Sequence, residues 1–280
     1  KNLREKIFED FKNLFEEKSI RSKKNFSFST PNRLVLVFEG LDKQIKIKSK
    51  EIRGPKTSAP EQALEGFLRS NKINKKDLFK KKTEKDEFYF YKTVATSLKT
   101  HDLLTEFIPK ILSNYQWKKS MKWGEFDLNW GRPLKSILSI FDKKIVSFKF
   151  HHLTSSNLTF LDKDFEEKKR SFENFKKYEK FFEDNGVIIN QNKRLKIINK
   201  SFLKILGKKG LKINENPKLI DEVVNLVDSP NVLLCKFDKK FLSVPKEILT
   251  LTMESHQKYF PTFNDKNEIT NEFLIVTNKK

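Results

Sequence analysis

The stretch "FSFSTPNRLVLVFEGL", residues 26–41, alternates apolar and polar side chains and then runs apolar. Both patterns are typical of a strand that packs on a core. Before it, residues 2–19 place Leu, Ile and Phe at helical spacing, which predicts an amphipathic helix. After it, residues 44–55 alternate again and end at Gly54-Pro55, a turn signal. This end of the chain therefore predicts a helix packed with strands.

The remainder of the chain continues this mixture, without an internal repeat or a heptad pattern. The helical patterns, one of them interrupted by Pro109, cover residues 58–71, 101–117, 162–182, 193–208, 217–227 and 246–260. Residues 231–238 and 241–245 are expected to form paired strands around a turn, and residues 271–278 a final strand. The predicted class is α+β, with mixed sheets and packed helices.

The charge of the chain is strongly positive. It carries 58 Lys and Arg against 37 Asp and Glu, a formal net charge of +21. A globular protein this basic typically binds a polyanion such as nucleic acid. The abundance of Lys, Asn, Ile and Phe also fits a biased genome, in which case much of the charge is a solvated surface. Composition alone supports both interpretations.

Cysteine usage and hydropathy bear on the cellular location. The single cysteine, Cys235, has no intramolecular partner for a disulfide, which fits a reducing cytoplasm. No apolar stretch reaches about 18 residues, so no membrane span is expected. We therefore predict a cytoplasmic protein with no membrane partner.

Most catalytic motifs are absent from the sequence. It has no phosphate-binding loop, no dinucleotide-binding glycine motif, no nucleophile elbow and no Cys-x-x-Cys pair. His151 and His152 are adjacent, so on a strand they would face opposite sides and share no metal. The sequence predicts no catalytic residue and no metal site.

Two stretches are unusual for this chain. The first, "KKSMKWGEFDLNWGRP" at 118–133, holds two of the three tryptophans, Trp123 and Trp130, and two of the eight glycines. It also contains the cations Lys119, Lys122 and Arg132. Glycine turns beside rings and cations suit an RNA backbone or unpaired bases. From these residues alone, a tight loop that its tryptophans hold on the core is the favoured interpretation.

The second stretch is "SHQKYFP", residues 255–261, where Lys258 and Tyr259 supply a charge and a ring. It fits a polar contact surface, or a helix C-terminus with Lys258 near the dipole and a proline that ends the helix. Arg53 is a weaker candidate. In a chain with only eight Arg it lies beside Gly54-Pro55, and its planar fork suits a phosphate.

Several short motifs occur in order along the chain. They are "STPNRLVL" at 29–36, "EIRGP" at 51–55, "ALEGF" at 63–67, "KSMKWG" at 119–124, "GRP" at 131–133, "LVDSPNVL" at 226–233, "FLSVPKEIL" at 241–249 and "HQKYFP" at 256–261. This ordered set resembles the β subunit of the bacterial heterotetrameric glycyl-tRNA synthetase. The resemblance covers nearly the whole chain and corresponds to the N-terminal portion of that subunit. It fails at residues 156–160, where the family has Gly-His-Arg-Phe and only Phe160 matches, so any role of that His and Arg does not carry over.

The resemblance implies a fold similar to the B3/B4 region of the phenylalanyl-tRNA synthetase β chain. It implies an N-terminal α+β part over 1–160, a charged helical insertion over 161–225, and a return of the α+β part over 226–280. The HD-like and anticodon-binding domains of the family are expected to lie outside this chain.

The resemblance also implies a function. This portion would bind glycine tRNA and support the ATP-dependent attachment of glycine by a partner α subunit, in an α2β2 assembly. ATP and Mg²⁺ are expected at the α subunit and no cofactor in this chain. By residue type and setting, the candidate RNA contacts are Lys119, Lys122, Arg132 and Lys258, with Arg53 a weaker candidate, and the aromatic landmarks are Trp123, Trp130 and Tyr259. The alternatives are a hydrolytic editing domain for mischarged tRNA, by fold analogy alone, and a scaffold for the α subunit without RNA contact.

Overall fold

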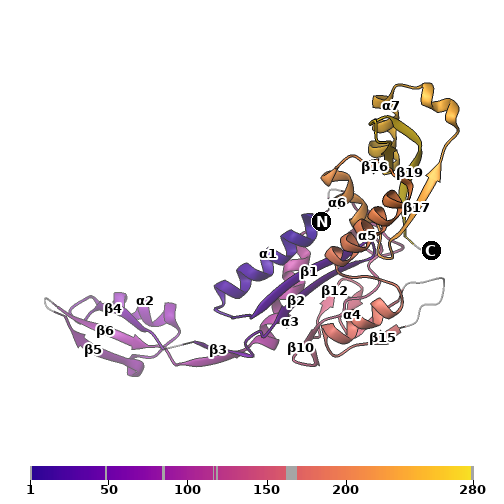
Figure 1. Ribbon diagram of the computed structural model, residues 1–280. Coiled ribbons are helices and arrows are strands. Elements are labelled where there is room, and N and C mark those ends of the chain that lie inside the picture. Colours follow the sequence, from indigo (N-terminus) through magenta and orange to yellow (C-terminus); the bar gives the residue numbers. More distant parts are fainter. Residues whose placement is uncertain are drawn as a thin grey trace.

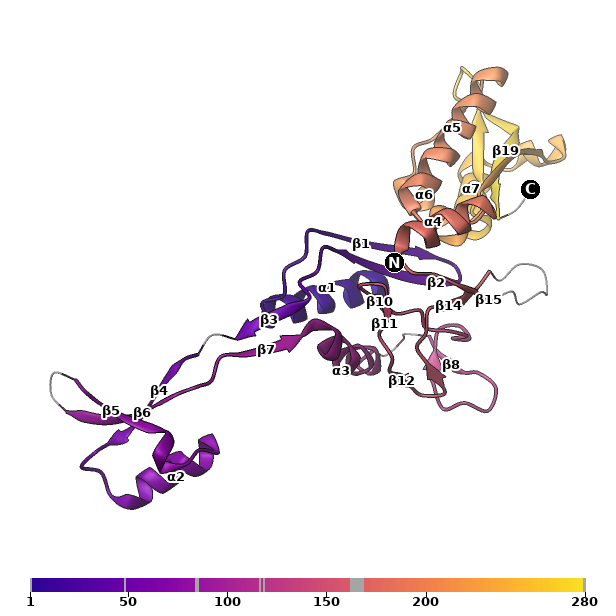
Figure 2. The same cartoon turned by 90° about the horizontal axis from the view of Figure 1, so that it is seen from below.

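Figure 1 shows the computed structural model of the chain, which describes residues 2–47, 49–83, 86–115, 117, 119–161 and 169–278. These residues form a central body, a small lobe on a two-stranded arm, and a C-terminal lobe. The small lobe and the C-terminal lobe lie at opposite ends of the molecule in both views (Figures 1 and 2). Helices and small antiparallel sheets are mixed along the chain, which confirms the predicted α+β class.

The body begins with a helix and a β-hairpin: α1 (Asn2–Glu17), β1 (Lys24–Thr30) and β2 (Arg33–Glu39). The helix predicted over 2–19 is confirmed, and its apolar face packs on the hairpin. The ring of Phe38 lies 4.9–6.0 Å, between centroids, from the rings of Phe8, Phe11 and Phe15. Residues 26–41, whose pattern is typical of a strand, contribute to two strands, β1 and β2. The chain reverses at Pro31-Asn32, and the two strands pair with each other.

A long excursion leaves the body after β2. Its arm is the antiparallel pair β3 (Gln44–Ile47) and β7 (Thr96–Lys99). Beyond the arm, residues 51–92, which we call the arm lobe, form a sheet of order β4-β6-β5 with one helix. The elements are β4 (Glu51–Lys56), α2 (Glu61–Asn71), the 3₁₀-helix η1 (Lys75–Asp77), β5 (Leu78–Lys82) and β6 (Glu87–Lys92). Helix α2 covers one face of the sheet, and no other described element covers the opposite face (Figures 1 and 2).

The chain returns to the body through α3 (Thr100–Ser113), which contains Pro109. The predicted interruption at Pro109 is wrong, because side chains on both sides of it, Leu104 and Ile111 among them, pack into the core that α1 shares. Three short hairpins complete this part of the body: β8 (Met121–Lys122) with β9 (Asn129–Trp130), β10 (Ile140–Phe141) with β11 (Lys144–Ile145), and β12 (Lys149–Phe150) with β13 (Leu153–Thr154).

A second core forms on the β1–β2 hairpin. It involves β14 (Leu158–Phe160), β15 (Lys169–Ser171) and α4 (Phe175–Asp184), and the ring of Phe28 stacks on that of Phe175 at 5.5 Å. The helix predicted over 162–182 is wrong at residues 169–171, which form a strand because they pair with β14. Residues 162–168 of that prediction lie outside the described residues.

The C-terminal lobe packs two helices on a sheet of order β16-β18-β19-β17. Its elements are α5 (Gln191–Lys209), β16 (Lys212–Ile213), α6 (Pro217–Leu226), β17 (Asn231–Lys236), η2 (Lys239–Ser243), α7 (Lys246–Leu251), the π-helix η3 (Thr252–Gln257), β18 (Phe260–Phe263) and β19 (Ile269–Thr277). Ile198 and Phe202 of α5 share a core with Phe260 and Leu274 of the sheet. The domain division at residues 160 and 225 stays a prediction.

One predicted strand pair is wrong in this lobe. Residues 239–243 form a 3₁₀-helix, because the Asp238 side chain accepts a hydrogen bond from the Lys240 N–H and starts a helical turn. Strand β17 pairs with β19 instead. In the part of the chain that the structure describes, no helix is long and apolar enough to cross a membrane.

Candidate nucleic-acid interface

The tryptophan-rich loop between β8 and β9 lies against the body. Trp130 is buried between Trp117 and Phe150, with ring centroids 4.9 and 6.0 Å away. Trp123 is half-buried, and its Nε1–H donates to the backbone oxygen of Trp130 at 2.9 Å. Both tryptophans therefore hold the loop in place, and its exposed side chains include Met121 and Phe126 as well as charged residues.

Gly131 has a steric reason to be glycine. A Cβ at this position would lie 2.5 Å from Cε3 of the Trp117 indole. We expect Gly131→Ala to lower the free energy of unfolding by about 1–3 kcal/mol, because a rigid ring must move. Urea unfolding followed by circular dichroism measures this.

Gly207→Ala is the matched control for that substitution. Gly207 lies inside α5, and its added Cβ would meet no atom within 4 Å. We expect this variant to be up to about 1 kcal/mol more stable than the parent, because alanine favours a helix interior. A Gly131→Ala protein as stable as the parent would contradict the steric role of Trp117.

The charged candidates of this loop are exposed, and two of them already have partners. Lys122 forms a 3.0 Å ion pair with Asp127, and this hydrogen bond and charge lower the pKa of the Asp127 carboxyl. Arg132 donates through Nη1 to Oδ1 of Asn32, in the β1–β2 turn, at 3.2 Å. Lys119 is exposed and forms no ion pair with a carboxylate among the described residues. The loop therefore presents one unpaired lysine and two tethered cations.

The other two candidates lie in other parts of the molecule. Lys258, half-buried at the end of η3, forms a 2.9 Å ion pair with Glu222 of α6, and Tyr259 stacks on Phe273 at 5.0 Å. Arg53 lies in the arm lobe, with its guanidinium carbon 3.6 Å from the centroid of the Phe88 ring. The structure thus places the five predicted contacts in three separate parts, near β8 and β9, at the end of η3 and on β4, and does not bring them together.

A row of lysines that the sequence prediction missed runs along α5. The α5 lysine row consists of Lys196, Lys200, Lys204 and Lys208, all exposed. Neighbours are four residues apart, which is about 6 Å along a helix. Helix α5 contains no Asp or Glu, and none of the four lysines pairs with any carboxylate that the structure describes. The spacing was visible in the sequence, but lysine runs are also typical of a solvated face.

The rest of α5 is fixed to its surroundings. Lys193, at its start, forms an ion pair with Glu179 of α4 at 3.2 Å. On the opposite face, the fully buried Arg194 donates to backbone carbonyls of three other segments. Figure 2 shows α5 along one side of the C-terminal lobe, with β19 beside it. The lysine row is therefore carried by a rigid helix.

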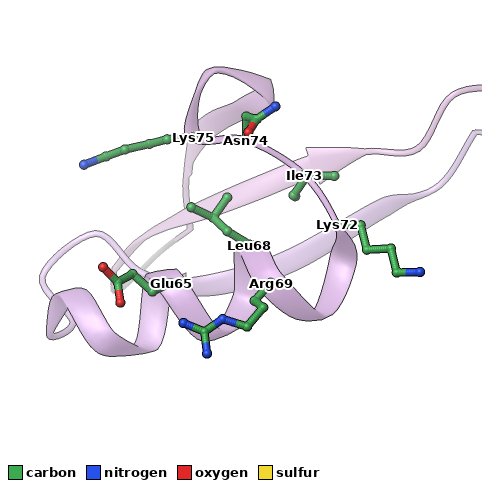
Figure 3. Close-up of a pocket in the computed structure, with 7 residues that line it drawn as sticks. All are labelled: Glu65, Leu68, Arg69, Lys72, Ile73, Asn74 and Lys75. Carbon is green, nitrogen blue, oxygen red and sulfur yellow. The ribbon is translucent and has the colours of Figure 1, made fainter.

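One shallow hollow lies on the arm lobe. It has a volume of about 530 Å³ and is lined by Glu65, Leu68, Arg69, Lys72, Ile73, Asn74 and Lys75. In Figure 3, Leu68 and Ile73 lie at its centre, while Lys72 and Lys75 point to opposite sides. Its charged groups do not converge on one point, so it is suited to a charged surface contact and not to a reacting centre.

The histidines and carboxylates do not gather into a metal centre where the structure describes them. No group of three or more His, Cys, Asp or Glu is placed to hold an ion among those residues. His151 and His152 lie at the turn between β12 and β13 and not on a strand, and His152 stacks on Phe126 at 3.7 Å. The fold and its cationic surfaces thus define a basic α+β protein suited to a polyanion.

Comparisons with known proteins give the family. A model of the family described as "Glycyl-tRNA synthetase beta subunit" matches residues 1–280. Relatives named "Glycine--tRNA ligase beta subunit" include those of Rickettsia felis, 35% identical over 280 residues, and Rickettsia bellii, 37% identical over 268 residues. The alignments cover 99% and 96% of this chain and 42% and 41% of the relatives. The chain therefore belongs to the glycyl-tRNA synthetase beta subunit family, and spans about two fifths of the length of these relatives.

Proposed function

We propose that this chain is the tRNA-binding, non-catalytic N-terminal portion of a glycine–tRNA ligase β subunit. The observation that carries the RNA contact is the α5 lysine row. Four unpaired cations one helical turn apart match a ladder of phosphates, and each phosphate they neutralise releases counterions. Because the row is about 18 Å long, it suits a backbone better than a single small anion. Because the family match covers the whole chain, we propose that the polyanion is a tRNA.

The proposal includes partners outside this chain. An α subunit carries the ATP- and Mg²⁺-dependent attachment of glycine, in an α2β2 assembly in the cytoplasm, and this chain holds no cofactor of its own. We further propose that its α+β fold is related to the B3/B4 region of the phenylalanyl-tRNA synthetase β chain, interrupted over 161–225 by the charged helical insertion. The family name supports a ligase subunit, and the roles of the two subunits are part of the proposal.

The predicted contact residues keep a role in this proposal. Lys119, Lys122 and Arg132 lie on or next to the paired strands β8 and β9 and are exposed, so they suit a second backbone contact. Lys258 already forms an ion pair with Glu222, so it would have to give up this carboxylate before it could bind a phosphate. We therefore rank Lys119 and Arg132 above Lys258 as RNA contacts.

Filter retention of glycine tRNA and of an unrelated tRNA, across a salt series, tests the proposed function. We expect binding that weakens steeply with salt and favours glycine tRNA, because phosphate contacts supply affinity and other contacts supply preference. A stable complex with the α subunit but no measurable affinity for either tRNA would overturn the proposal and leave a scaffold.

A further inference from the structure

The arm-lobe sheet presents aromatic rings on the face that α2 leaves uncovered. An added Cβ on Gly54 would lie 3.0 Å from Phe67 of α2, so Gly54 faces the helix. The register of β4 with β6 shifts between Arg53 and Lys56, and Arg53, which precedes the shift and still pairs regularly, points to the face opposite Gly54 and α2. Arg53 lies opposite Phe90 in the register, and Phe90 lies opposite Phe79. These three residues therefore form one row across the uncovered face.

The rings on this face are arranged as a platform. Phe79 and Phe90 stack with centroids 6.0 Å apart and an interplanar angle of 27°. Phe88 lies two residues from Phe90 on the same face, but its ring is buried under the Arg53 guanidinium at 3.6 Å, so Phe79 and Phe90 are the rings open to a ligand. Phe79 is 37% exposed, and Phe90 is half-buried. Antiparallel sheets normally place polar side chains on a solvated face, so a face of phenylalanines is unusual.

Cations surround these rings. Lys81 lies 5.6 Å from the centre of the Phe90 ring, and it neutralises Glu51 at 2.9 Å. No carboxylate of the described residues forms an ion pair with Arg53, which is exposed. The whole arm lobe holds eleven Lys and Arg against seven Asp and Glu. Exposed rings suit a partner with flat rings that can stack on them. The surrounding cations suit a partner that is also negatively charged.

We propose that the uncovered face of the arm-lobe sheet binds unpaired RNA nucleotides, with bases stacked on Phe79 and Phe90 and a phosphate held by Arg53. Base–aromatic stacking on a sheet, next to cations that follow the backbone, is a general mode of single-strand binding. The proposal rests on the proposed function, because it takes RNA to be the partner. It adds that one contact depends on unpaired bases, at the opposite end of the molecule from the α5 lysine row.

Fluorescence anisotropy with the whole chain tests this proposal. The probes are a labelled 12-nucleotide RNA that forms no pairs and a duplex RNA with the same number of phosphates. We expect Phe79→Leu to weaken binding of the single strand about fivefold or more, and to leave duplex binding unchanged, because duplex bases offer no free face. Phe79→Trp keeps a flat ring and should retain the affinity of the parent for the single strand.

The control is Phe241→Leu, which removes a ring of 47% exposure in the C-terminal lobe and should change neither affinity. Equal single-strand binding by Phe79→Leu and the parent overturns the stacking site, and so does equal loss in Phe79→Leu and Phe79→Trp, which indicates damaged packing. Weakened capture of the α subunit by Phe79→Leu, with RNA binding intact, would make the face a protein contact. In each of these cases tRNA binding by the parent protein still supports the proposed function, whereas its absence removes that function.

Discussion

Replacing Arg194 with methionine is expected to lower the free energy of unfolding by about 3–5 kcal/mol, because buried backbone carbonyls lose their hydrogen-bond donor. Arg194 is fully buried. Its Nη1 donates to the oxygens of Ile188 and Ile189 at 2.7 and 2.9 Å, and its Nε to Val224 at 3.0 Å. Its Nη2 donates to Ser29 of β1 at 2.7 Å. One guanidinium therefore joins the body hairpin to both helices of the C-terminal lobe.

The charge state of this side chain explains why it resists substitution. Burial lowers the pKa of Arg194 to about 10, and the nearby Asp228 opposes that shift. The guanidinium is still charged at neutral pH, and its cost of burial is offset only while its donors are used. Lysine has one ammonium and cannot reach carbonyls on three segments. Arg194→Lys is therefore expected to recover little of the lost stability.

Urea unfolding followed by circular dichroism measures the loss. The matched control is Arg69→Met, at an exposed position of α2, where we expect a change within about 0.5 kcal/mol. Since a whole domain is stable by only about 5–15 kcal/mol, Arg194→Met should unfold at markedly lower urea. Identical midpoints for the two variants would show that the four hydrogen bonds contribute nothing to stability.

Changing Lys196, Lys200, Lys204 and Lys208 to glutamine together is expected to reduce the salt dependence of tRNA binding. Each phosphate contact contributes about 0.7–0.9 to the slope of log Kd against log salt, so the slope should fall by about 3. The fold should be retained, because all four side chains are exposed and glutamine is a good helix former. Filter retention of glycine tRNA over a salt series measures the slope.

The control for this variant removes the same charge from the same lobe. Lys218, Lys239, Lys246 and Lys266 are also exposed, but they are scattered over different elements. If the α5 row contacts the backbone, the scattered variant should lose much less of the slope than the row variant. Equal losses in both variants would mean that net charge, and not the ladder on α5, sets the affinity.

Local patterns in the sequence were sufficient for much of this molecule. The spacing of Phe11 and Phe15 predicted α1, because one apolar face on a helix must be buried wherever the helix packs. The ordered motifs predicted the family, and the mixture of periodicities predicted the α+β class. Within the stretch 118–133, Trp130 and Gly131 stand out by residue type, and the structure explains both through the contact with Trp117.

Tertiary structure alone decided which charges are free and which rings are exposed. Arg194 looks like one more cation in a lysine-rich helix, yet it is buried because Ser29, 165 residues away, accepts its hydrogen bond. Lys258 forms an ion pair with Glu222 of another helix, while Lys200 has no carboxylate partner among the residues that the structure describes. The phenylalanines of β6 lie on an uncovered face only because α2 packs on the other one. A sequence determines the charge and shape of each side chain, but burial and pairing depend on residues that the fold brings together from distant positions.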